Sequence, residues 1–346
     1  MAVKRIDELT EKEEKRATEV YQKAIVIECL TAGSTLKHPE YIGETRDAGV
    51  TATHFTMLEL EDDMRGALDH IAGWYEMARQ NDAIIARSAD DIVRAKEEKR
   101  PCVIWGAQNA KPLEEDLKYV RILHALGLRI IQLAYDQPNY IGTGGSEPDR
   151  GITKFGRTVI EEMNRVGVLI DVSHCGDQTV MDAIKHSQDP IAITHANPRA
   201  MVNEIRNKTD EQMLALAEKG GVIGLTAYSP WARVKKGVRP TVDDFLDLME
   251  YVIKLIGVDH VGFGLDLSPH WDWEPEGYYR WAEQYPDLAA MDVEERVVEG
   301  LHHVSKVKNL ARGLVARGYS DDDILKVLGG NFLNLFRKVW GVEPGH

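Results

Sequence analysis

The sequence predicts an α/β protein of the (β/α)8 barrel (TIM barrel) class, and three observations support this prediction. Short apolar runs rich in β-branched residues alternate with longer segments of helical periodicity. The apolar runs show no polar alternation, which is typical of parallel strands covered on both faces. Eight such runs are present, and no glycine-rich phosphate loop follows the first, so a barrel is favoured over an open dinucleotide-binding sheet.

The individual elements follow from these runs in chain order. The predicted strands are residues 24–30, 49–58, 101–107, 129–135, 167–174, 190–196, 221–228 and 260–267. The segments between them have apolar residues at helical spacing, and several end in glycine just before the next strand, as helix C-termini often do.

All 346 residues are predicted to form one domain, 1–346, because barrels of about 250 residues or more commonly fold as a single unit. Residues 1–20 are charged and helical in pattern, and we interpret them as an N-terminal helical extension. The long connection after the eighth strand, residues 269–300, is interpreted as an insertion.

Composition restricts the classes of partner. With 42 basic and 56 acidic residues, the net charge of −14 argues against binding to nucleic acid or to an anionic membrane surface. No apolar signal segment or bilayer-spanning run is present. The three cysteines, Cys29, Cys102 and Cys175, lie far apart, which favours reduced thiols and a cytoplasmic location.

Reactive groups of a barrel are expected at the C-terminal ends of its strands. His174 and His195 end successive predicted strands, and Asp266 ends the eighth. Because neighbouring strands lie about 4.8 Å apart, the two imidazoles could meet on one zinc ion. The alternative is that each histidine only caps its strand by bonding to the backbone.

Other polar and aromatic groups carry weaker signals. Arg206 follows the sixth strand, where an arginine suits capture of a substrate carboxylate, with a surface ion pair as the alternative. Asp171 is interpreted as bonding nearby backbone, and Cys175 as a buried thiol. The aromatic residues within 271–281 suit a pocket roof, internal packing or a subunit interface.

Several segments together resemble one known family. They are GRTVIEEMNRVGVLIDVSHCGDQTVMDAI, PIAITHANPRAM, VDHVGFGLDL and GYSDDDILKVLGGNFLNLF. In this order and spacing, over about residues 20–340, the chain resembles the bacterial branch of the membrane (renal) dipeptidase family of the amidohydrolase superfamily. The resemblance implies a metal-dependent hydrolase that cleaves dipeptides or related small amides, and so a small-molecule partner.

The resemblance also implies roles for single residues. His174 and His195 match two ligands of the second of two zinc ions, and Asp266 matches the group that contacts the first metal and transfers the proton. Tyr135 stands where better-known members have a substrate-contacting histidine. The residues expected to bind substrate are Arg206, Tyr135 and His54.

The first-metal ligands of the family are missing from this sequence. The His-x-Asp of the first strand is replaced by Leu30 and Ala32, and the bridging Glu of the third strand by Trp105. An intact two-zinc centre is therefore not expected. Glu28, two positions before Leu30, is either a replacement ligand or part of the buried structure.

Three hypotheses follow. The leading one is a dipeptidase-like hydrolase with at most one zinc ion, held by His174, His195 and Asp266, with Glu28 as a further candidate ligand. The second is a metal-independent acid–base enzyme of isomerase or lyase type on a small carboxylate. The third is a non-catalytic binding protein on a decayed site. The aromatic stretch and the resemblance are also compatible with a homodimer.

Overall fold

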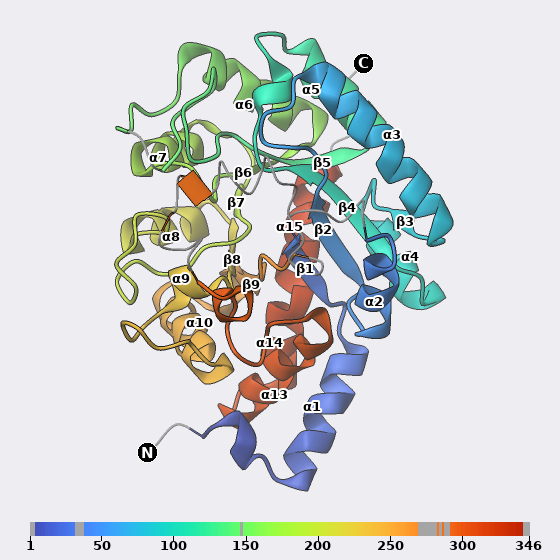
Figure 1. The fold of residues 1–346 in the computed structure, drawn as a ribbon, viewed down its shortest axis with the longest axis vertical. Coiled ribbons are helices and arrows are strands. Elements are labelled where there is room, and N and C mark those ends of the chain that lie inside the picture. Colours follow the sequence, from blue (N-terminus) through green and yellow to red (C-terminus); the bar gives the residue numbers. More distant parts are fainter. Residues whose placement is uncertain are drawn as a thin grey trace.

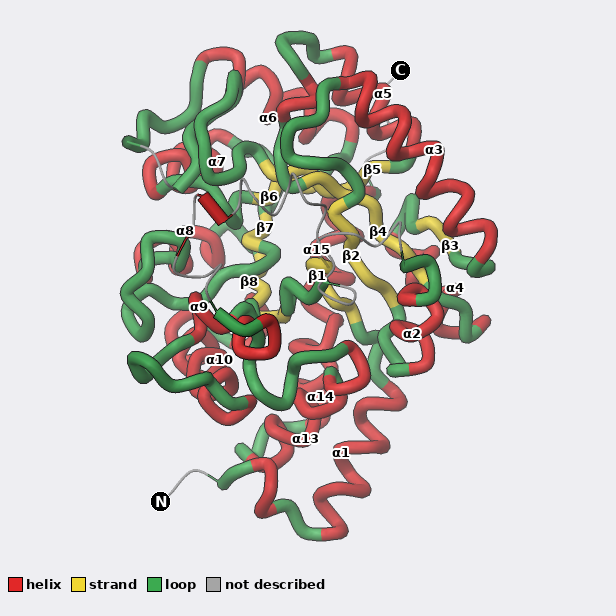
Figure 2. The backbone as a smooth tube through the Cα atoms, viewed as in Figure 1, coloured by secondary structure: helices red, strands yellow, loops and turns green. Residues whose placement is uncertain are grey.

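A parallel sheet rolled into a barrel forms the centre of the protein, and helices surround it (Figures 1 and 2). The structure is a computed structural model that describes residues 4–31, 38–145, 148–268, 282–283, 286 and 291–341. Its strands are β1 (Ile27–Thr31), β2 (Ala52–Thr56), β3 (Ile84–Ile85), β4 (Cys102–Ala107), β5 (Leu128–Gln132), β6 (Leu169–Asp171), β7 (Ala192–Ile193), β8 (Val222–Leu225) and β9 (Val261–Phe263). The predicted (β/α)8 barrel is confirmed.

The strands pair in the order β1-β2-β4-β5-β6-β7-β8-β9, always in parallel. The ring closes between its two ends, where Thr31 bridges Leu267 and the Asp266 amide donates to the Leu30 carbonyl at 3.1 Å. All eight predicted strands are present in shorter form. The additional strand β3 pairs with β4, and its two residues are too few to give a periodic signal in the sequence.

Helices alternate with the strands and cover the outside of the barrel (Figure 2). They are α1 (Glu11–Lys23), α2 (Tyr41–Asp47), α3 (Met64–Gln80), α4 (Ala89–Glu98), α5 (Lys118–Leu126), α6 (Lys154–Val166), α7 (Asp177–His186), α8 (Asp210–Glu218), α9 (Ser229–Ala232), α10 (Val242–Ile256), α13 (Lys308–Ala316), α14 (Asp321–Leu325) and α15 (Asn331–Trp340). The expected glycine C-caps are confirmed at Gly127 and Gly167, whose φ angles of 115° and 81° lie in the left-handed region.

Apolar side chains pack in two separate layers, an outer one between strands and helices and an inner one that extends from the barrel interior to α4 and α15. The inner layer joins the first residues of several strands to α15, which covers the N-terminal end of the barrel. Trp105 belongs to the outer layer, where its ring meets Tyr75 edge-on with centroids 4.6 Å apart. Trp105 thus faces the helices rather than the barrel interior.

Some sequence predictions concern residues outside the described ranges. These are Ala32, the aromatic stretch 271–281 and most of the connection 269–300. Among the helices that the structure does describe, none is both long and apolar enough to cross a membrane.

Candidate active site

The two predicted histidines meet at the C-terminal end of the barrel. His174 lies three residues beyond β6 and His195 two residues beyond β7, and both side chains are buried. Their Nε2 atoms are 3.0 Å apart. Parallel pairing of β6 with β7 at Asp171 and Ala192 brings the two strand ends side by side. The prediction that they come together on adjacent strands therefore agrees with the structure.

A carboxylate and an aromatic ring orient His174. The Nδ1 atom of His174 lies 2.9 Å from Oδ1 of Asp136, which is also buried. The ring of Tyr135 stacks on the imidazole with centroids 3.9 Å apart and an interplanar angle of 22°. Since a carboxylate accepts hydrogen bonds, we assign the proton of the neutral imidazole to Nδ1 and the lone pair to Nε2.

His195 is oriented by the polar network at the ends of β6 and β7. Its Nδ1 lies 2.8 Å from Oγ1 of Thr194, whose hydroxyl donates to Oδ2 of Asp171 at 2.7 Å. Oδ1 of Asp171 also accepts the amides of Ser173 and Thr194. The Thr194 oxygen thus accepts from Nδ1, which leaves a lone pair on Nε2 of His195. Asp171 bonds nearby backbone as expected and also fixes the tautomer of His195.

Two lone pairs that face each other at 3.0 Å repel unless a cation lies between them. Burial, followed by the charge of Arg206, lowers the pKa of both His174 and His195 well below the ordinary range, so an added proton is disfavoured. Neutral imidazole nitrogen is a common zinc donor. The pair therefore fits a single metal cation as two members of its donor set.

The described ranges contain no group of three or more His, Cys, Asp or Glu side chains arranged to hold a metal ion. Within these ranges the imidazole pair is therefore assembled without a complete set of protein ligands. Whether Asp266 or Glu28 adds to this pair stays a prediction.

Asp266 occupies a strained position beyond β9. Its φ angle of 60° is left-handed, which is uncommon for a residue other than glycine and concentrates at functional sites. Burial raises the pKa of Asp266 to about 6, with a further rise from Asp136 and an opposing effect of Arg206. A carboxyl group with a pKa close to neutral suits proton transfer.

Arg206 is buried, and its guanidinium joins the two histidine-bearing strand ends. One terminal nitrogen donates to the Ser173 carbonyl and the other to the His195 carbonyl at 2.8 Å. Its Nε has no hydrogen-bond partner among the residues that the structure describes. The surface ion pair considered for Arg206 is therefore not what the structure shows.

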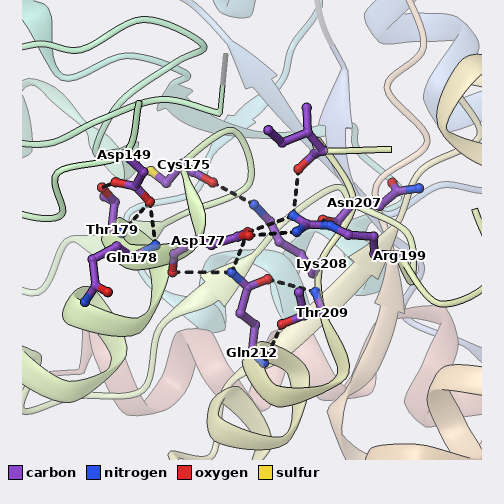
Figure 3. A network of polar contacts seen from close by, with 11 residues as sticks. Asp149, Cys175, Asp177, Gln178, Thr179, Arg199, Asn207, Lys208, Thr209 and Gln212 are labelled. Carbon is purple, nitrogen blue, oxygen red and sulfur yellow. Dashed lines mark hydrogen bonds and ion pairs between the residues drawn. The ribbon is translucent and has the colours of Figure 1, made fainter. Parts of the chain in front are cut away.

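The loop that carries Arg206 is held by a polar network (Figure 3). Arg199 forms a two-bonded ion pair with Asp177 at the start of α7, with both distances 2.7 Å. The buried Lys208 donates to the Cys175 carbonyl at 3.0 Å, and burial lowers the pKa of Lys208 to about 7. Cys175 is a buried thiol whose pKa burial raises to about 12, as expected of an unreactive cysteine.

His54 lies inside the barrel, on β2. Its Nδ1 donates to the Cys29 carbonyl at 2.7 Å, so Nε2 carries the lone pair. This Nε2 is buried without a hydrogen-bond partner in the described structure, and a Cβ on Gly106 would lie 2.1 Å from it. Glycine on β4 therefore leaves the space that the imidazole occupies.

Glu28 lies at the closure of the barrel. Its Oε1 accepts the amides of Leu265 at 2.7 Å and Leu30 at 3.3 Å, and its Oε2 accepts the Thr31 hydroxyl at 2.9 Å. Burial raises the pKa of Glu28 to about 8. Of the two interpretations of Glu28, these contacts favour the buried structural role.

Sequence reasoning missed Asp136. It directly follows Tyr135, the last residue of a predicted strand, so a search that extended one residue past each strand end would have included it. Its contact with His174 depends on the loop after β5, whose path the periodicity of the sequence does not encode.

Asp136→Asn is expected to weaken zinc binding about 10–100-fold, because a neutral amide accepts the bond from Nδ1 of His174 more weakly than a carboxylate does. The amide can also turn its NH₂ group toward Nδ1, which favours the opposite tautomer. Competition with a coloured chelator measures the affinity, and ¹⁵N NMR of the imidazoles measures the tautomer. Asp90→Asn, on the surface of α4, is the control. An unchanged tautomer with unchanged affinity would contradict the role of Asp136.

The fold defines the class of protein, an amidohydrolase-type (β/α)8 barrel. A solved amidohydrolase from Pseudomonas aeruginosa superposes with a TM-score of 0.85 and 30% identity, over 94% of this chain and 99% of that chain. A metallopeptidase from Rhodobacter sphaeroides, liganded with a phosphinate mimic of the dipeptide L-Ala-D-Ala, shares the fold with a TM-score of 0.77 and 19% identity, over 92% of this chain and 100% of that chain.

The family follows from sequence comparison. The model of the membrane dipeptidase family (peptidase family M19) matches residues 34–291 and 289–344, and the chain belongs to this family. The dipeptidase tcpJ of Claviceps purpurea is 29% identical over 258 residues, which are 74% of this chain and 55% of that protein. The chain thus spans little more than half the length of this curated relative. The predicted family is confirmed.

Proposed function

We propose that this protein hydrolyses the amide bond of a dipeptide, or of a related small amide that carries a carboxylate. The observation that carries the proposal is the buried pair His174–His195, with Nε2 atoms 3.0 Å apart and tautomers set by separate carboxylates. Membership of the dipeptidase family supports the reaction class. The dipeptide mimic bound by the structural relative supports the substrate class.

We infer that His174 and His195 hold at most one zinc ion, with Asp266 as the third candidate ligand or as the general base. The chemistry that zinc supplies in such sites is polarisation of the scissile carbonyl and activation of water. Asp266 accepts a proton from the attacking water and returns it to the leaving amine, a task that suits its pKa of about 6. In the reacting complex Nε of Arg206 donates to the carboxylate of the substrate.

The other two predicted substrate-binding residues have distinct parts in this proposal. The Tyr135 ring, stacked on His174, limits the side of the site from which a substrate approaches. The Nε2 of His54 accepts a hydrogen bond from the substrate, which gives this buried lone pair the partner that it lacks within the described ranges.

Release of free amino acids from a dipeptide panel tests the proposal. Chelation is expected to abolish turnover and added zinc to restore it, and His174→Ala is expected to lower kcat/KM by about 10²–10³-fold. His186→Ala, at the end of α7 where His186 pairs with Glu161, is the matched control. If hydrolysis survives both chelation and His174→Ala, the reaction does not depend on a metal held by His174, and that part of the proposal is wrong.

A metal-independent acid–base reaction on a small carboxylate, of isomerase or lyase type, is the second candidate. Such a reaction would use His174, His195 and Asp266 as general acids and bases, and the pKa of Asp266 near 6 suits this role. Turnover of such a substrate that resists chelation and has a bell-shaped pH profile favours this candidate. A tightly bound stoichiometric zinc ion counts against it.

A further inference from the structure

A cleft of about 550 Å³ opens on the N-terminal side of the barrel, away from the histidine pair. Its walls come from α1, the turn between α2 and β2, the end of α4, and α13, which packs beside α1 (Figure 1). Thr51 and Arg100, which line it, lie just before β2 and β4, whereas the candidate active site lies beyond the ends of the strands. Small-molecule sites typically have volumes of about 300–1,000 Å³.

Cationic side chains outnumber acidic ones in the lining of this cleft, whereas the whole chain has a net charge of −14. Among the lining residues Asp47 is the one carboxylate, and it pairs with Arg46 at 2.8 Å. Two other lining arginines are also neutralised, Arg100 by Asp82 and Arg312 by Glu14. The arginines of the lining are thus paired with acids, in contrast to its lysines.

The three lysines of the cleft, Lys96, Lys99 and Lys308, have no ion pair within the described part of the chain. Lys96 is half-buried, and this burial lowers its pKa because no carboxylate compensates for the lost hydration. Lys99 has a left-handed φ of 54°, a conformation that helix ends usually reserve for glycine. An anionic group bound beside Lys96 would relieve the desolvation of this amine.

The inner wall of the cleft is apolar. The buried side chains Ala17, Val50 and Ala95 line it, together with the largely buried ring of Tyr21. The Tyr21 hydroxyl donates to the Ala48 carbonyl at 2.9 Å and so holds the ring in place. A ligand that matches this cleft therefore combines an organic body with several negative charges.

We propose that this cleft binds a small organic polyanion, a molecule with two or more phosphate or carboxylate groups. The charged groups lie against Lys96, Lys99 and Lys308, and the organic body lies against Tyr21. Because the cleft is separate from the histidine pair, this binding does not depend on the proposed hydrolysis and does not compete with a dipeptide.

Isothermal titration calorimetry of the full chain at constant ionic strength tests the proposal. The three probes are ATP, pyrophosphate and citrate. We expect at least one probe to bind saturably with 1:1 stoichiometry. Its affinity is expected to fall at least about tenfold in the double variant Lys99→Glu/Lys308→Glu, since two attractions become repulsions. Both lysines are exposed, so the double variant is expected to keep the fold, and circular dichroism checks this.

Three further variants locate the binding. Lys235→Glu, at an exposed loop position outside the cleft, makes the same change of charge and is expected to leave the affinity unchanged. Lys96→Gln, which keeps the size of the side chain, is expected to weaken binding without reversing the charge. His174→Ala is expected to leave probe binding intact.

The pattern of outcomes decides between ligands and can overturn the proposal. Binding of ATP alone assigns the cleft to nucleotides, and binding of citrate alone assigns it to polycarboxylates. Inorganic sulfate, titrated in the same way, is the reference for a simple anion. The proposal is wrong if none of the three probes binds more tightly than sulfate. It is also wrong if Lys99→Glu/Lys308→Glu binds like the unchanged protein, or if His174→Ala removes binding.

Discussion

Replacing Asp266 with asparagine is expected to lower kcat/KM for dipeptide hydrolysis by about 10³-fold, within the range of general acid–base catalysis. The amide keeps the size of the side chain but neither accepts nor returns a proton. In the unchanged protein kcat/KM is expected to fall as the pH drops below about 6, because Asp266 becomes protonated there. The asparagine variant should lose this acidic limb of the profile.

The measurement is a pH–rate profile of kcat/KM for both proteins. Asp259→Asn provides the control, since Asp259 is an exposed carboxylate paired with Lys326 at 2.7 Å on the N-terminal side of β9. A loss of less than about tenfold, with the acidic limb unchanged, would show that another group transfers the proton.

Glu28→Ala is expected to lower the free energy of unfolding by about 2–4 kcal/mol. The change leaves the buried amides of Leu265 and Leu30 without their shared acceptor at the closure of the barrel. Glu28→Gln is the matched control, because its carbonyl oxygen still accepts from both amides. Denaturant unfolding of the three proteins at several pH values measures the effect.

The pH dependence of the free energy of unfolding distinguishes the effect of the charge on Glu28 from the effect of its hydrogen bonds. Burial raises its pKa from an ordinary value of 4.5 to about 8, so the folded state binds a proton that the unfolded state releases. The contribution of this carboxyl group to stability is therefore greatest below about pH 4.5 and declines as the pH rises toward 8.

Glu28→Gln removes this titration. The free energy of unfolding of this variant should therefore decline less between about pH 4.5 and 8 than that of the unchanged protein. If Glu28→Ala instead left stability within about 0.5 kcal/mol but removed a bound metal, Glu28 would be the replacement ligand considered from the sequence. The two interpretations of Glu28 therefore predict different observables.

Much of the fold could be predicted from the sequence because its signals are local. The apolar runs of a parallel barrel and the glycines after α5 and α6 lie within a few residues of the structure they specify. The positions of the histidines could be predicted for the same reason, since each ends a strand that the apolar runs predict and lies two or three residues beyond the observed strand. The strand ends were placed less well, and the two-residue β3 was missed, because short pairings depend on neighbours distant in the chain.

The details of the site could not be predicted because they are set by side chains from different strands. Asp136 reaches His174 across 38 positions of the chain, and Glu28 reaches Leu265 across 237. Arg206 was singled out as a group for a substrate carboxylate, yet two of its nitrogens donate to backbone carbonyls that hold the strand ends together. The sequence contains these residues but not the distances between them.

The sequence by itself determined the barrel, the family and the positions of His174, His195 and Asp266, because each depends on periodicity or on local motifs. Only the tertiary structure decided that the two imidazoles face each other through their Nε2 atoms. It also decided that Glu28 accepts the amides of Leu265 and Leu30 where the barrel closes. Tautomers, pKa shifts and hydrogen-bond partners arise from burial and from contacts between distant segments. Such contacts exist only once the barrel has closed.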